Sequence, residues 1–311
     1  MAVQDDGVGV GPDSALKGVA LVALAVLLFA LGDTVGKHLA MLYAVPLIMA
    51  ARYLVNLGLL VVFLYPRHGA ALWQTRRPWL VMVRGLCLAA GSLSMGLALK
   101  VMPVGETVAI IYLAPFAVML LAGRLLGEEV RPMAWAGAAL GFAGVLLIAR
   151  PGSGLDPTGV ALSLVSAACA TAYHLLTRVL MRTETTIAVV FHTALVGVVV
   201  FCIMALWSLD GPLPGALDMG LTVLFGVLAT LGHVVFTMAY REAPAALLAP
   251  VNYLHIVFAV GLGWLVFGHV PDGWSQVGMT LVVVSGMGVA LRAGVRRVGV
   301  LRVGAEVRRR G

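Results

Sequence analysis

The sequence predicts an all-α integral membrane protein of ten transmembrane helices, arranged as two inverted repeats of five helices each. Hydrophobic residues make up 61% of the 311 residues and charged residues only 11%, whereas roughly a quarter of the residues in a soluble domain are charged. Apolar stretches of on the order of 20 residues, the length that a helix needs to cross a bilayer, recur along the chain. The chain also matches itself without a gap when it is shifted by 141 positions.

Ten apolar stretches alternate with short connections that contain proline, glycine and charged residues. The expected spans are residues 16–36, 45–65, 79–99, 104–126, 133–150, 157–178, 186–207, 219–240, 245–267 and 273–292. Five of them fall in each half of the chain. We therefore expect an N-terminal tail over residues 1–15, a first repeat over 16–150, a second repeat over 151–292 and a basic C-terminal tail over 293–311.

The internal match falls on residue types that are rare in this chain or that shape a helix. Pro103 aligns with Pro244, and Tyr112 aligns with Tyr253, although the chain has only 14 prolines and 7 tyrosines. Glycines align as well, among them Gly18 with Gly159, Gly85 with Gly226 and Gly91 with Gly232. Internal duplication in an apolar chain is typical of secondary transporters.

An odd number of helices places the start and the end of one repeat on opposite sides of the membrane. The second repeat therefore enters from the side opposite to the first, and the two halves are antiparallel. Such halves are related by a pseudo-two-fold axis in the membrane plane, which provides two nearly equivalent gates, one facing each side. We therefore expect a carrier that works by alternating access.

Basic residues predict the orientation. With the N-terminus in the cytoplasm, sixteen Lys and Arg residues lie on the cytoplasmic side and three, Lys37, Lys100 and Arg150, lie outside. This positive-inside pattern predicts both termini in the cytoplasm, at a bacterial inner membrane. The net charge of +7 follows from the same distribution, and we expect anionic lipids, not nucleic acid, as the partners of the basic tail.

The first repeat resembles a known family. The matching segments are Met102-Pro103-Val104-Gly105-Glu106-Thr107, Tyr112-Leu113-Ala114-Pro115, Leu126-Gly127-Glu128-Glu129, Trp135-Ala136-Gly137 and Gly144-Val145-Leu146-Leu147. They are similar to the half-unit of the EamA family, in the drug/metabolite transporter superfamily. The resemblance covers all ten spans, and the second repeat departs from it at Ile256 and His269. It implies an inner-membrane carrier of small metabolites, often an exporter, with a central cavity between the repeats.

Polar and aromatic side chains inside the spans are the candidates for binding a small-molecule substrate, because such groups in hydrocarbon usually face a cavity or a partner. Tyr112 and Tyr253 align near the middle of spans four and nine, where each ring can stack on a substrate or pack in the core. Arg84 either attracts an anionic group or extends to the headgroups. The remaining candidates are Asn252, His255, His233 and Ser92.

Charged residues in the spans are candidates for coupling or gating. Asp33 aligns with His174, and this pair could relay protons, because burial can raise the pKa of a carboxylic acid toward that of histidine. Alternatively, Asp33 pairs with Lys37 one turn later on the same helix. Arg52 is expected to pair with Glu106 or with Asp33, as an outer gate or as a structural clasp.

Two prolines inside predicted spans are the last candidates. Pro115 and Pro250 each free a backbone carbonyl and could kink spans four and nine, for gating or for packing.

Other classes of protein lack a signature in this sequence. The chain has no HExxH or GxSxG motif and no phosphate-binding GxxxxGK[ST] loop, so we predict no metal site, no cofactor, no enzymatic activity and no direct coupling to ATP. We expect a secondary transporter of an amino acid, a related metabolite or a drug-like compound, exporting it as a monomer or a homodimer. Proton coupling is left open, and an intramembrane enzyme or a channel is the alternative.

Overall fold

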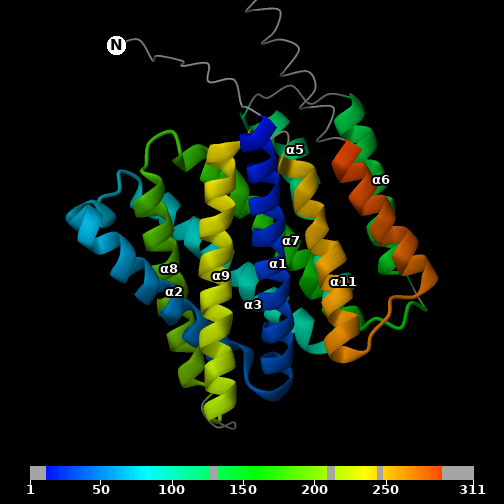
Figure 1. The fold of residues 1–311 in the computed structure, drawn as a ribbon, viewed down its shortest axis with the longest axis horizontal. Helices are drawn as coiled ribbons and strands as arrows, with labels where there is room; N and C mark the ends of the chain where they lie inside the picture. The colour runs from blue at the N-terminus through cyan, green and yellow to red at the C-terminus, as the bar shows by residue number, and fades with distance from the viewer. Residues whose placement is uncertain (1–11, 127–131, 151, 209–213, 244–247, 289–311) are drawn as a thin grey trace, which may run out of the picture.

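The computed structural model describes residues 12–126, 132–150, 152–208, 214–243 and 248–288, and within these ranges the chain is helical without a strand. The helices stand side by side in one bundle, in which α1 (Pro12–Leu42) runs along α9 (Ala216–Glu242) and beside α11 (Leu254–Phe267) (Figure 1). The remaining elements are α2 (Val45–His68), α3 (Pro78–Val101), α4 (Val104–Ile111), α5 (Leu113–Leu126), α6 (Pro132–Ile148), α7 (Pro157–Leu180), α8 (Thr186–Leu206), a helix over residues 273–288, and the short 3-10 helices η1 (Gly69–Leu72) and η2 (Ala249–Tyr253).

Some sequence-based expectations fall on residues outside these ranges. They are the basic tail over 293–311 with its lipid contacts, most of the tail over 1–15, Pro244, and the Gly127-Glu128-Glu129 segment.

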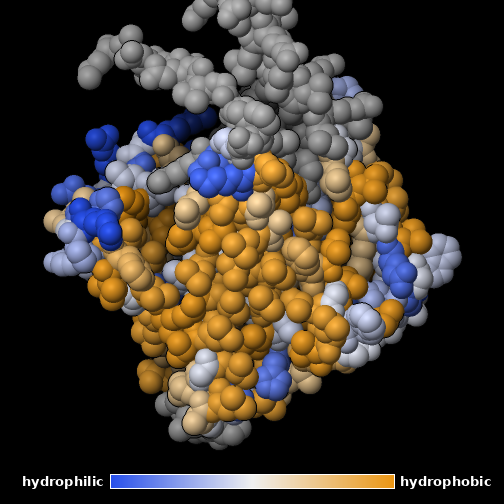
Figure 2. Space-filling view, in the orientation of Figure 1, coloured by the Kyte–Doolittle hydropathy of each residue, from blue (hydrophilic) through white to orange (hydrophobic). Residues whose placement is uncertain are grey.

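Seven helices in the described ranges are long and apolar enough to cross a membrane, and two further apolar helices, Trp135–Ile148 and Val251–Phe267, are shorter. Large apolar side chains such as Phe63, Trp79 and Leu265 are exposed on the surface of the bundle. Figure 2 shows a continuous apolar surface over α1, α9 and α11, with hydrophilic residues gathered toward the ends. A surface of this kind is suited to lipid, so the chain is a multi-pass helical membrane protein.

Spans four and nine are interrupted, although each was expected to be one helix. Tyr112 lies between α4 and α5, and Tyr253 ends η2 just before α11. Pro115 explains the first break, because a proline has no N–H to donate to the carbonyl of Ile111 four residues earlier. Pro115 consequently lies in the first turn of α5, and Pro250 is the second residue of η2, so the expected kinks are helix breaks.

The 141-residue offset recurs in the helix boundaries. Val45 begins α2 and Thr186 begins α8, and the helix α5 over 113–126 corresponds to α11 over 254–267. Similarly, α3 ends 141 positions before the end of α9. The duplicated sequence has therefore kept the same pattern of helices.

Packing between the halves is reciprocal. The helix α1 packs extensively on α9, while their counterparts α7 and α3 pack on each other, and α2 packs on its own counterpart α8. The helices α3 and α8 approach closely at Gly85, where an added Cβ would lie 2.8 Å from the Cβ of Val196. The counterpart Gly226 is equally close to Val55, the counterpart of Val196, at 2.7 Å. A contact that recurs with the roles of the two halves exchanged is what a two-fold relation between them produces.

Candidate functional site

The two interrupted helices meet inside the bundle. The Tyr112 hydroxyl donates a hydrogen bond to the backbone carbonyl of Asn252 at 2.7 Å, and the ring centroid of Tyr112 lies 5.2 Å from that of Tyr253. Tyr253 is only 6% exposed and lies directly against Gly286 of the last described helix. Tyr112, at the helix break in the first half, therefore stabilises the helix break in the second half through a hydrogen bond and a ring contact.

His255 joins this contact to α1. Its Nε2 lies 3.1 Å from Oδ2 of Asp33, and the two side chains are 12% and 16% exposed. The two atoms lack the angles of a hydrogen bond, so the contact is an ion pair when His255 is protonated. The expected pairing of Asp33 with Lys37 is wrong, because the ammonium of Lys37 donates to the carbonyls of Leu99 and Met102, each at 2.7 Å, at the end of α3.

Phe29 and His233 extend this group of side chains. The ring of Phe29 lies 4.9 Å from His233 and 6.3 Å from His255, and the ring of Tyr112 lies 5.9 Å from His255. Asn252 adds a buried side-chain oxygen that has no hydrogen-bond partner in the described part of the chain. We name the aromatic–histidine cluster after its members: Phe29, Asp33, Tyr112, His233, Tyr253 and His255.

The aromatic–histidine cluster combines aromatic faces with a titratable pair and lies beside unwound backbone. Its residues come from both halves of the chain, on α1, α9, α11 and the two helix breaks. Unwound backbone beside polar side chains is also found at the substrate sites of secondary transporters that are built from internal repeats.

Arg84 is buried in a separate polar group. It is 3% exposed, its Nε donates to the hydroxyl of Thr177 at 2.7 Å, and its other nitrogens donate to Tyr173 at 2.6 Å and to Thr193. Its guanidinium also lies 4.1 Å from the centroid of the Tyr173 ring. The interpretation in which Arg84 extends to the headgroups is wrong, because hydroxyl groups on α7 and α8 satisfy the guanidinium inside the bundle. Within the described residues, no carboxylate pairs with Arg84.

The expected partners of Arg52 are occupied by histidines. Glu106 accepts a hydrogen bond from His269, and Asp33 faces His255. Arg52 instead lies with its guanidinium 4.7 Å from the ring centroid of Phe225. The expected ion pair of Arg52 with either acid is therefore wrong, and a cation–π contact takes its place.

His174 and Ser92 lie apart from the aromatic–histidine cluster. The ring of His174 lies 5.2 Å from that of Tyr173, beside Arg84, whereas its counterpart Asp33 belongs to the aromatic–histidine cluster. Ser92 shares a hydrogen bond of 3.0 Å with the hydroxyl of Tyr53. The structure thus brings together six of the sequence candidates, which are Asp33, Tyr112, His233, Asn252, Tyr253 and His255. Pro115 and Pro250 lie at the two helix breaks beside them.

Two polar contacts join the halves at opposite ends of the bundle (Figure 1). At one end, Tyr43 in the α1–α2 connection donates to the carboxylate of Asp218 near the start of α9, at 2.6 Å. At the other end, Glu184 in the α7–α8 connection accepts from the backbone N–H groups of Arg76 at 2.9 Å and Arg77 at 2.7 Å. We call these contacts the Tyr43 latch and the Glu184 latch.

The two latches are built from equivalent positions. Tyr43 and Glu184 are 141 residues apart, as are Arg77 and Asp218. The sequence analysis missed them because it compared identical residues, whereas the signal was a polar residue in each connection. It likewise missed Phe29, whose partners come from helices far away in the sequence.

The family profile that matches this chain describes EamA-like transporters, and it matches twice, over residues 16–150 and 157–291. The protein belongs to the EamA-like transporter family. The riboflavin transporter of Rhizobium johnstonii is 30% identical to it over 288 residues, which cover 88% of this chain and 91% of that protein. The pseudopaline exporter CntI of Pseudomonas aeruginosa is 31% identical over 233 residues, covering 74% and 81% of the two chains.

More distant proteins agree with this assignment. The S-adenosylmethionine uptake transporter of Rickettsia prowazekii is 22% identical over 272 residues, covering 86% of this chain and 90% of that one. A crystal structure of a protein with 22% sequence identity has the same fold, with a TM-score of 0.60 over 92% of this chain and 98% of that chain. The family and the named relatives are transporters of small molecules, so this protein is a small-molecule transporter and not an enzyme.

Proposed function

We propose that this transporter is a secondary carrier of a small polar metabolite, working by alternating access between two inverted repeats of five helices each. The observation that carries the proposal is the pair of equivalent latches at opposite ends of the bundle. A carrier needs two gates that open in turn, whereas a channel needs one continuous path. The reciprocal contacts of Gly85 and Gly226 support the same relation between the halves.

The predicted orientation assigns a side to each latch. The positive-inside pattern puts the Glu184 latch, which lies beside Arg76 and Arg77, at the cytoplasmic end. The Tyr43 latch then lies at the outer end. Both termini are cytoplasmic in this orientation, and the membrane is the inner membrane of a bacterium, in keeping with the bacterial relatives.

The proposed substrate site is the aromatic–histidine cluster. Tyr112 and His255 offer rings for stacking, and the free side-chain oxygen of Asn252 can accept a hydrogen bond from the substrate. His233 is exposed beside Phe29 and offers a further polar contact. Tyr253 supports the site from behind, because its ring is packed between Tyr112 and the last helix.

The proposed proton carrier is the pair of Asp33 and His255. These side chains lie in different halves of the protein, so a change in their protonation acts directly on the contact between the halves. The proton carried by the pair makes His255 positive beside the Asp33 carboxylate, and the resulting ion pair holds α1 against α11. Release of that proton therefore weakens a contact between the halves, which is what coupling to a conformational change requires.

The proposed direction is export. The names of the relatives include both directions, since CntI is an exporter and the Rickettsia protein an uptake transporter. Export is favoured because the exporter is 31% identical to this chain, whereas the uptake transporter is 22% identical.

The test is counterflow of radiolabelled metabolites in vesicles that contain the purified protein. We expect saturable counterflow of a small polar metabolite, at least about tenfold slower in Tyr112→Ala, because a stacking ring and a hydrogen bond are lost together. Asp33→Asn should keep counterflow and lose its acceleration by a pH gradient. Export predicts that inside-out vesicles accumulate substrate when their interior is acidic.

Tyr65→Ala is the matched control, since Tyr65 is 55% exposed on the surface of the bundle and should leave transport unchanged. Single-channel conductance, or counterflow that is normal in Tyr112→Ala, would contradict the proposal. A pH response that survives in Asp33→Asn would contradict the role of that pair alone.

A further inference from the structure

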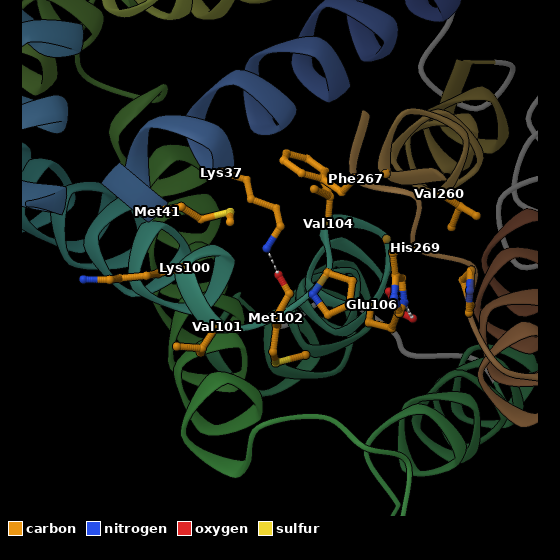
Figure 3. A pocket seen from close by; sticks show the side chains of 14 residues that line it. Lys37, Met41, Lys100, Val101, Met102, Val104, Glu106, Val260, Phe267 and His269 are labelled. Atoms are coloured by element: carbon orange, nitrogen blue, oxygen red, sulfur yellow. Dashed lines mark hydrogen bonds and ion pairs between the residues drawn. The ribbon is translucent and has the colours of Figure 1, made fainter. Parts of the chain in front are cut away.

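A pocket of about 310 Å³ lies at the end of the bundle where α1, α3 and α11 end and α4 begins (Figure 3). Its lining comes from both halves of the chain. The polar side chains that line it are those of Lys37, Lys100, Glu106 and His269, and the rest of the lining is largely apolar, including Met41, Val104, Val260 and Phe267. The pocket shares none of its lining with the aromatic–histidine cluster.

Glu106 presents an unused acceptor in this pocket. Its side chain is 2% exposed, and its Oε1 accepts a hydrogen bond of 2.9 Å from Nε2 of His269. Its Oε2 is buried and has no hydrogen-bond partner among the described residues. A buried carboxylate oxygen without a hydrogen-bond donor raises the free energy of the folded protein, so a ligand that donates a hydrogen bond to this oxygen would be bound favourably.

Lys37 provides the opposite charge across the pocket. Its ammonium donates to two backbone carbonyls, and among the described residues the third of its three N–H groups has no hydrogen-bond acceptor. It also lies 5.4 Å from the centroid of the Phe267 ring, so the positive charge is held in place at the wall of the pocket. Figure 3 shows Lys37 and Glu106 on either side of Val104 and Met102.

We propose that this pocket binds a small zwitterion, with its ammonium group at Oε2 of Glu106 and its carboxylate group at Lys37. An amine alone would leave the Lys37 charge unused, and a carboxylate alone would leave Oε2 of Glu106 without a donor. The apolar lining accepts a short aliphatic side chain. The inference rests on the proposed function, since it makes the pocket an exit site that an amino-acid-like substrate occupies before it leaves at the outer end.

The test is the melting temperature of the purified full-length protein with three probes of similar shape. L-leucine carries both charges, isoamylamine carries only the positive charge, and 4-methylpentanoate carries only the negative charge. We expect L-leucine to raise the melting temperature and to bind roughly tenfold more tightly than either single-charge probe, because each of those leaves one charged group unpaired. Equal shifts with all three probes, or no shift with any, would overturn the proposal.

Two variants locate the binding. Glu106→Gln should weaken L-leucine binding about tenfold by removing the charge that faces the ammonium group, while Tyr65→Ala, at an exposed position outside the pocket, should leave it unchanged. His269→Gln keeps the Glu106 carboxylate and a donor to its Oε1, so it should retain the L-leucine shift even if Glu106→Gln folds poorly. Loss of the shift in Tyr112→Ala but not in Glu106→Gln would place the ligand in the aromatic–histidine cluster and overturn the proposal.

These binding measurements need no transport, so the two proposals fail separately. A normal L-leucine shift in a protein that shows no counterflow would contradict the proposed function alone. Normal counterflow with no L-leucine shift would contradict the pocket alone.

Discussion

The Tyr43 latch and the Glu184 latch occupy equivalent positions but use different chemistry. Glu184 is 9% exposed, and its carboxylate accepts from two backbone N–H groups at the start of α3. The side chain of Asp218 is 21% exposed and accepts from one tyrosine hydroxyl. The difference teaches that duplication conserved where the halves touch, while later sequence change set how strongly they touch.

The Glu184 latch should be the stronger of the two. A buried carboxylate at the first amides of a helix benefits from charged hydrogen bonds and from the helix dipole. The Tyr43 latch has one hydrogen-bond donor, with Nε2 of His38 at 3.9 Å from the other carboxylate oxygen of Asp218. The hydrogen bond to Asp218 raises the pKa of Tyr43, which keeps its hydroxyl protonated. A carrier with unequal gates favours the state in which the stronger gate is closed.

The largest effect is expected from Glu184→Gln. Loss of the charge should weaken both amide contacts by about 1–2 kcal/mol in total, which shifts the population toward an open end at this latch by roughly tenfold. Spin labels at the exposed positions Gln74 and Arg182 should report a longer distance by electron paramagnetic resonance. An unchanged distance distribution would show that Glu184 does not hold this end closed.

A smaller effect is expected from Tyr43→Phe. It removes one hydrogen bond from a half-buried carboxylate, worth about 1 kcal/mol or less. Spin labels at Met41 and Leu217, which are 55% and 78% exposed, should report opening at this end by less than Glu184→Gln produces at the other. An equal or larger opening would reverse the ranking of the two latches.

The smallest effect is expected from Asp272, at the same end as Tyr43. The hydrogen bond from Arg150, with donors from Ser275, lowers the pKa of Asp272 from 3.8 to about 2. Because the folded pKa lies below the unfolded value, the stabilisation is present above about pH 4 and is lost as the pH falls toward 2. The melting temperature should therefore fall slightly more in the wild type than in Asp272→Asn over this range, and parallel curves would show that Asp272 contributes nothing.

The positions of the helices and the prolines at which spans four and nine depart from a straight helix were predictable from the sequence, but the breaks themselves and the contacts of the charged side chains were not. Hydropathy locates a helix because every residue contributes to it, and Pro115 locates a break because it removes a hydrogen bond at one known carbonyl. Lys37 shows the limit of local spacing. It lies one turn from Asp33 on α1, yet it reaches the end of α3.

The sequence by itself determined the membrane class, the internal duplication, the approximate positions of the helices and the family, because these depend on composition and on order along the chain. Only the tertiary structure decided that Asp33 faces His255, that Glu106 faces His269 and that Arg84 is held by hydroxyl groups. The physical reason is that a buried polar group in a bundle takes its partner from whichever helix lies opposite. That choice depends on the rotation and depth of two helices, which packing sets and hydropathy does not record.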